Sequence, residues 1–407
     1  MHRFGGFVTL VALAAVTAGV GPVAAQAPAD SAKKAGADTV KADTAKAAAP
    51  PAPAGSKVNL SGYVTASYTY SSRHTGGAGS PIVGRLYDRF HDQIELNAAK
   101  LTLDKPVATD KWDAGAHVDL LFGQNAPVLQ SAGLSLGTNG DVEQAYATVN
   151  IPAGAGKYVQ FKAGKFVTLL GLEVIEDIAN PNLSEGNQFI YVENFTMTGV
   201  RLDAKPDPKV DFELALINGW DVVQDNNSKK SFMGRLGLTP DSLTTVGLAG
   251  YVGNEKTAVA GVTPSGNRYG LDLLVTRKVG KATLNVQGDY GEEKDLPAVG
   301  QTAKWWAAGL WAAVDVSPFL NVALRGDYVD DRDGVRTSGV LGFPANTGQE
   351  QKFGSGTLTL NIKRWDAVLI RPEIRYDRSN LLVFPATDGT LHKDQVTFAL
   401  GASYIFQ

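Results

Sequence analysis

The chain has 407 residues, a formal net charge of −3 and no cysteine. This charge balance excludes a strongly basic nucleic-acid-binding surface and an acidic tail, and the absence of cysteine excludes a disulfide framework. The 45 glycines and 13 tyrosines among many valine, leucine and threonine residues indicate a β-rich chain. A chain of this length normally divides into domains. No linker is visible after residue 57, and a single large closed sheet explains this.

Residues 1–25 have the pattern of an export signal. His2 and Arg3 precede an apolar run over residues 7–20, and small residues suited to cleavage follow at Ala25 and Ala27. A membrane-anchor helix is the less favoured alternative, because the run is short for a span and a cleavage pattern follows it. We therefore predict a signal peptide that is removed after Ala25 or Ala27.

Residues 26–56 form a low-complexity segment of Ala, Pro, Lys, Asp, Thr and Gly. Apart from Val40 the segment lacks aromatic and large apolar residues, so it cannot bury a core. We predict a flexible segment in the periplasm, and docking to the cell wall through its lysines is the alternative. Residues 57–407 are expected to form the folded part.

From Val58 onward, apolar and polar residues alternate with the period of two that β-strands require. In the last such segment, Phe398 and Leu400 share one face, and Gln395 and Thr397 lie on the other. A soluble antiparallel sheet also alternates. Here, however, the polar face carries full charges on several strands, as the water-filled interior of a wide barrel does.

Short and long connections also alternate along the chain. Short links such as 279–280 and 317–318 interleave with long ones such as 73–90 and 331–351, which is the outer-membrane barrel pattern. We predict an all-β fold, a transmembrane antiparallel β-barrel of about 16 strands with short periplasmic turns and long extracellular loops. A barrel of this size leaves an aqueous channel.

The long connection 165–194 is the candidate pore constriction. Its charged residues are Lys165, Glu173, Glu176, Asp177, Glu185 and Glu193, and no Lys or Arg follows Lys165 within it. We expect the loop to fold into the barrel and to give the pore a preference for cations. Two alternatives remain, namely a solvated loop outside the barrel and neutralisation of its carboxylates by Arg201, Arg371 and Arg375.

The front half of this connection, residues 166–178, has the spacing of a helix. Val167, Leu170, Val174 and Ile178 are expected to share one helical face. The sequence at residues 179–182 contains Pro181 and ends any such helix.

Charged residues on the polar faces of the strands are the candidate lumen wall. They include Lys162, Arg201, Arg235, Arg325, Arg371, Glu373, Arg375 and Asp377. Many are expected to pair across neighbouring strands, whereas opposed basic and acidic walls would give a transverse field. Trp305, Trp306 and Trp311 are expected to divide between the two faces of the sheet, and tyrosines near strand ends to form interfacial girdles.

Motifs for catalysis or metal binding are weak. Residues 133–137 match Gly-x-Ser-x-Gly, but they lie in a long loop rather than in a strand–turn–helix. None of the five histidines has metal-ligand spacing, and residues 330–334 resemble a calcium loop without its distal Glu. We expect no catalytic residue, no metal and no cofactor.

Several motifs resemble the β-barrel porin type 2 (OmpL-like) family. They lie at residues 141–146, 164–171, 195–201, 218–221 and 371–377, and the resemblance spans nearly all of the predicted barrel. It implies a pore-forming protein of the outer membrane. The chain departs from the common pattern at its end, where Gln407 follows the aromatic Phe406.

These features together predict an outer-membrane porin, a passive diffusion channel for small hydrophilic solutes that is not an enzyme. The expected partners are outer-membrane lipid and lipopolysaccharide, the solutes and the barrel-assembly machinery. Nucleic acid is not expected, and a homo-oligomer is suggested by analogy alone. The alternatives are a non-conducting barrel that is structural or binds the cell wall or a partner, and, less favoured, a barrel that serves as the scaffold of an enzyme.

Overall fold

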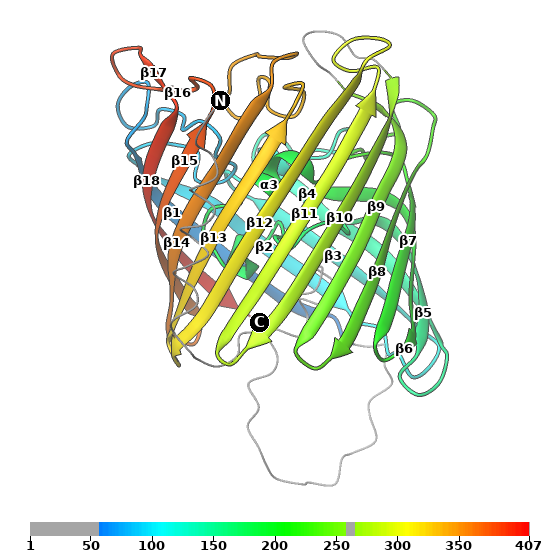
Figure 1. Cartoon of the computed structure of the whole chain (residues 1–407). Helices are drawn as coiled ribbons and strands as arrows, with labels where there is room; N and C mark the ends of the chain where they lie inside the picture. The colour runs from blue at the N-terminus through cyan, green and yellow to red at the C-terminus, as the bar shows by residue number, and fades with distance from the viewer. Residues whose placement is uncertain (1–56, 258–264, 407) are drawn as a thin grey trace.

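The computed structural model describes residues 57–257 and 265–406 (Figure 1). The predicted export signal, the low-complexity segment and Gln407 lie outside the described residues. The two described ranges contain the predicted folded part except residues 258–264 and Gln407.

Sixteen strands of the described chain form one closed barrel, which confirms the predicted fold. They are β1 (Asn59–Ser71), β2 (Gln93–Lys105), β3 (Asp113–Phe122), β4 (Gly140–Pro152), β5 (Tyr158–Val167), β6 (Thr196–Asp207), β7 (Val210–Ile217), β8 (Ser231–Asp241), β9 (Thr244–Lys256), β10 (Ser265–Val279), β11 (Ala282–Lys294), β12 (Thr302–Ser317), β13 (Leu320–Asp331), β14 (Gln351–Trp365), β15 (Val368–Ser379) and β18 (Asp394–Phe406). Each strand pairs antiparallel with its neighbours, and β1 closes the barrel against β18. The short links lie at one end and the long loops at the other (Figure 1).

Four other strands and helices lie within the long loops, and a short 3-10 helix accompanies them. They are α2 (Ala126–Leu129), α3 (Asn187–Val192), β16 (Phe384–Pro385) and β17 (Leu391–His392), and the 3-10 helix is Asp177–Ala179. β16 and β17 pair with each other and form a small separate sheet. None of the helices in the described residues is long and apolar enough to cross a membrane.

The barrel is apolar outside and polar inside. On β18, Phe398 and Leu400 point outward and are 52% and 50% exposed, whereas Gln395 and Thr397 point inward and are each 2% exposed. This arrangement is the reverse of that in a soluble protein and places the apolar side chains where lipid would cover them.

The short links are tight turns because the pairing of the two strands continues almost to their ends. Val279 pairs with Ala282, so only Gly280 and Lys281 connect β10 to β11. Gly280 has a φ of 59°, a left-handed conformation that glycine adopts without the steric penalty of a side chain.

The three clustered tryptophans divide between the faces as predicted. Trp305 and Trp311 point inward and are 2% and 1% exposed. Trp306 points outward, and its Nε1–H donates to the Oδ2 atom of Asp330 at 3.1 Å. The side chain of Trp311 can therefore contact groups inside the barrel.

Candidate functional site

The connection between β5 and β6, residues 168–195, folds into the barrel. Helix α3 lies inside the barrel (Figure 1) and packs against β11, β12 and β13. Lys165 does not belong to this loop, because it lies within β5 and pairs with Asp141 on β4, with its Nζ atom 3.2 Å from Oδ2. We therefore use the term inward loop for residues 168–195.

The predicted helix in the front half of the loop is wrong. Residues 168–176 form no helix, and the α-helix of the loop lies later, at Asn187–Val192. In this segment, backbone N–H groups donate to side-chain oxygens rather than to the carbonyl oxygens that would accept them in a helix. Leu170 N–H donates to Thr168 Oγ1, and Leu172 N–H donates to Gln287 Oε1 of β11. The apolar spacing thus reflects contacts with two different surfaces rather than one helical face.

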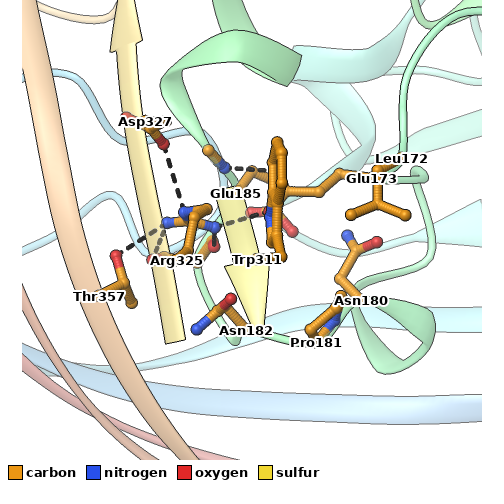
Figure 2. Close-up of polar contacts among 12 residues, drawn as sticks. Leu172, Glu173, Asn180, Pro181, Asn182, Glu185, Trp311, Arg325, Asp327 and Thr357 are labelled. Carbon is orange, nitrogen blue, oxygen red and sulfur yellow. Dashed lines mark hydrogen bonds and ion pairs between the residues drawn. The ribbon is translucent and has the colours of Figure 1, made fainter. Parts of the chain in front are cut away.

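Arg325 of β13 is the centre of the first attachment of the loop to the wall. Its Nη1 atom lies 2.8 Å from Oε1 of Glu173, and Trp311 Nε1–H donates to the same oxygen at 3.0 Å. Arg325 also pairs with Asp327 at 3.3 Å and donates to Thr357 at 3.1 Å. Figure 2 shows Arg325 between these partners, with Trp311 beside Glu173. Arg325 and Glu173 are both at most 2% exposed, so their charges are paired away from bulk water.

Residues of β15 hold the middle of the loop. Arg371 Nη1 donates to the backbone oxygen of Asp177 at 2.7 Å, and its Nη2 atom lies 3.7 Å from the carboxylate of Asp177. Arg375 donates to the backbone oxygen of Glu185 at 2.6 Å and pairs with Asp377 at 2.8 Å. Glu373 accepts the N–H of Leu183 at 2.7 Å. The polar face of β15 therefore binds the loop mainly through its backbone.

A lysine on β2, three strands away from β15 around the barrel, makes the third attachment. Carboxylate oxygens of Asp119, Glu143 and Glu176 lie within 4.8 Å of one another, as metal ligands do. The Nζ atom of Lys100 lies among them, at 3.0 Å, 2.6 Å and 2.5 Å respectively. The ammonium group thus supplies the positive charge that this cluster requires.

Glu185 and Glu193 are buried and form no ion pair within the described part of the chain. Both oxygens of Glu185 lack a hydrogen-bond partner among the described residues, and Glu193 accepts one bond, from Gln287 Nε2 at 2.7 Å. Burial raises the pKa of both carboxyls well above the usual range, which favours their neutral form. Burial also raises the pKa of Asp177, although Arg371 opposes this shift.

The other side of the loop meets the barrel through apolar contacts. Leu169 and Leu170 of the loop, together with Phe166 at the end of β5, pack against inward-facing residues of β6–β9, which are Met197, Ala215, Ile217, Met233, Ala249 and Tyr251. We call these nine residues the apolar seam. Each is at most 6% exposed. The inward loop therefore reaches from the β6–β9 wall to the β11–β15 wall.

The remaining predicted wall residues lie on β5, β6 and β8 and form ion pairs with neighbouring carboxylates. Lys162 Nζ lies 2.9 Å from Asp203, which also pairs with Arg201 at 2.6 Å. Arg235 pairs with Asp211 at 2.8 Å and with Glu213 at 3.5 Å. The predicted cross-strand pairing is confirmed on this wall. Arg201 also lies 4.0 Å from Glu213 of β7, so its ion pairs include carboxylates of the barrel wall.

Sequence reasoning missed Lys100 and Glu143 because β-bulges shift the faces of their strands. On β2, Glu95 and Asn97 point inward, and strict alternation would turn Lys100 outward. A register shift opposite Thr65 and Ala66 reverses the faces, so Lys100 points inward. The sequence predicted that Trp305, Trp306 and Trp311 divide between the two faces of the sheet, but it did not predict the partner of Trp311. That partner, Glu173, is 138 positions away in the sequence, so no local pattern indicates the contact.

The weak motifs have local explanations. Ser135 lies in an exposed loop, where its hydroxyl donates to the backbone oxygen of Gly137. Asp331, from the segment that resembles a calcium loop, accepts backbone N–H groups of Val335, Arg336 and Thr337 at 2.9–3.1 Å. Its carboxylate thereby orders the start of the β13–β14 loop.

Comparisons with known proteins agree with this architecture. The sequence profile of the family described as "Putative beta-barrel porin-2, OmpL-like" matches residues 57–406. A comparison of the sequence with curated proteins gave no match.

Among solved structures, the chain is similar to an anion-selective porin from Comamonas acidovorans. The TM-score is 0.59 at 11% identity, over 86% of this chain and 99% of that one. The outer membrane protein OmpT of Vibrio cholerae gives a TM-score of 0.57 at 12% identity, over 86% of this chain and 97% of that one. The outer membrane channel DcaP of Acinetobacter baumannii gives 0.55 at 15% identity, over 87% and 99%. At these identities the likeness concerns the fold.

Proposed function

The chain belongs to the beta-barrel porin-2, OmpL-like family of outer-membrane porins. We therefore propose that it is a passive diffusion channel for small hydrophilic solutes and that residues 168–195 narrow the channel. We further propose that the channel has no enzymatic activity. We also propose that residues 1–25 are a signal peptide and that residues 26–56 lie in the periplasm. The partners expected from sequence, including the barrel-assembly machinery and a second copy of the chain, belong to the proposal as well.

The single observation that carries the proposal is the position of the inward loop inside a sixteen-strand barrel. A barrel of this size encloses an aqueous interior unless it is filled by its own chain. The loop crosses that interior from Leu170 at the apolar seam to Arg325 on β13 and Arg371 on β15. It therefore sets the narrowest part of any path for solutes.

The charge balance favours weak ion selectivity over the cation preference expected from sequence. Glu173 and Glu176 pair with Arg325 and Lys100, and the other loop carboxyls have raised pKa values. Few uncompensated negative charges are then left to attract cations.

The test is the conductance of the purified barrel in a planar lipid bilayer. We expect ohmic single-channel steps from the wild type. Leu170→Ala or Met233→Ala removes bulk from the apolar seam and should raise the conductance. Leu248→Ala is the matched control, because Leu248 points outward and is 48% exposed, and it should leave the conductance unchanged.

A second candidate is a non-conducting barrel that is structural or binds the cell wall. The burial of the apolar seam favours it, since a dry apolar constriction blocks ions. Absence of conductance from the wild type and from both seam variants, with normal folding, would support this candidate and contradict a diffusion channel.

A further inference from the structure

The outer part of the barrel interior contains an arginine that forms no ion pair with a carboxylate of the described residues. We propose that Arg336, together with Trp220, binds the carboxylate or phosphate group of small anionic solutes at the entrance above the inward loop. This inference rests on the proposed function and deepens it, because it names the class of solute that the channel takes up.

Arg336 is fixed in place by groups from several parts of the chain. It belongs to the β13–β14 loop, and its Nε–H donates to the backbone oxygen of Tyr191 in α3 at 2.6 Å. Its guanidinium carbon lies 5.1 Å from the ring centroid of Trp305 and 5.5 Å from that of Trp220. Trp305 is on the inner face of β12, so the guanidinium group lies within the barrel and beside the inward loop.

The carboxylates around Arg336 are bound to other donors. Asp331 accepts three backbone N–H groups and the hydroxyl of Thr337. Asp221 accepts the N–H groups of Phe195 and Thr196 at 2.7 Å and 2.9 Å.

The two nearby glutamates are likewise engaged. Glu293 pairs with Arg268 at 2.7 Å. Glu255 accepts the hydroxyl of Ser231 at 2.8 Å and the N–H of Trp220 at 3.1 Å. Within residues 57–257 and 265–406, Arg336 forms no ion pair, so its two Nη groups keep their donors.

These free donors are accessible and charged. Arg336 and Trp220 are both half-buried, whereas Trp305 and Arg268 are buried. Neither Nη group of Arg336 has a hydrogen-bond partner among the described residues, and the side chain is partly exposed. Burial and the charge of Arg268 lower the pKa of Arg336 to about 10, which leaves the group positively charged at neutral pH.

The chemistry of this pair selects oxyanions. A guanidinium group presents parallel N–H donors that match the two oxygens of a carboxylate or phosphate. The indole N–H of Trp220 makes no hydrogen bond within the described chain and offers a further donor. Arg268 lies 4.6 Å from the same ring and adds positive potential, although Glu293 pairs with it.

The test is a titration of the detergent-solubilised, lipid-free barrel with sodium phosphate at constant ionic strength, followed by tryptophan fluorescence. We expect saturable binding by the wild type and an affinity lower by about 10- to 100-fold in Arg336→Gln, which corresponds to the loss of one charge-assisted hydrogen-bonded contact. Arg336→Lys keeps the charge without the planar fork and should bind with intermediate affinity.

Arg332→Gln is the matched control, since Arg332 lies in the same loop, is exposed and contacts neither tryptophan. It should bind phosphate as the wild type does. The inference is overturned if the wild type shows no saturable phosphate binding, or if Arg332→Gln loses as much affinity as Arg336→Gln. The fluorescence measurement does not require conduction. A barrel that binds phosphate without conducting therefore refutes the diffusion channel alone, and a conducting barrel without binding refutes this inference alone.

Discussion

At the scale of single residues, arginines on the inner face of the barrel bind the inward loop and hold it in place. Arg325 is 1% exposed and pairs with both Glu173 and Asp327. Removing one partner of a buried pair leaves an uncompensated charge, which typically costs about 3–5 kcal/mol. The acidic character of the loop, read from sequence as a source of selectivity, is here mainly a means of attachment.

We therefore expect Arg325→Met to lower the free energy of unfolding by about 3–5 kcal/mol. Urea unfolding of the barrel in lipid vesicles measures the change. Arg277→Met is the control, because the pair of Arg277 with Asp241 is about half exposed on both sides and should contribute nothing measurable. Equal losses in the two variants would contradict the role assigned to Arg325.

Glu193 gives a prediction about pH. Its folded pKa lies well above the usual value of 4.5, so the folded state binds more protons than the unfolded state above pH 4.5. The contribution of Glu193 to stability is then fully present below pH 4.5 and is lost as pH rises through the folded pKa. Glu193→Gln mimics the neutral form and should make the stability less dependent on pH above 4.5. Urea unfolding at several pH values checks this, and an unchanged pH dependence would contradict it.

At the scale of elements, the strands followed from sequence, whereas the secondary structure within the inward loop did not. Alternation predicts strands well because each face of a barrel strand meets one environment, such as lipid at Leu400 and the polar interior at Thr397. The inward loop contacts both the apolar seam and the polar wall of the barrel, so the helical spacing of Leu170 and Val174 does not indicate a helix. The bulge before Lys100 reversed a face within one strand, and no local pattern marks such a shift. The partners of Glu173 come from β12 and β13, which are distant in sequence.

Strand β10 offers a matched test of the face assignment. Leu273 and Leu274 are adjacent, but Leu273 points outward and is 47% exposed, whereas Leu274 points inward and is half-buried. Leu273→Arg should cost about 2–4 kcal/mol if the residue lies near the bilayer midplane. Leu274→Arg should cost much less, because the new charge reaches the polar interior. Unfolding in lipid vesicles compares the two, and the reverse order would undo the assignment.

At the scale of the whole molecule, the described structure begins at residue 57. The family match also starts at residue 57, and residues 26–56 have almost no apolar surface to bury. A variant that lacks residues 26–56 but keeps the signal should therefore reach the outer membrane and show the normal shift in electrophoretic mobility on heating. Failure to assemble would show that this segment takes part in folding or insertion.

The inward loop is attached to several parts of the barrel wall, and this has a mechanical consequence. A sheet closed into a tube is stiff along its strands, and its softest deformation is a flattening of the circular cross-section into an ellipse. A strut across the diameter, tied by Arg325 and Arg371 at one end and packed on Met197 and Met233 at the other, resists that flattening. Lateral tension in the membrane would therefore load the strut first, and the apolar end, which has no ion pair, would yield before the arginine end.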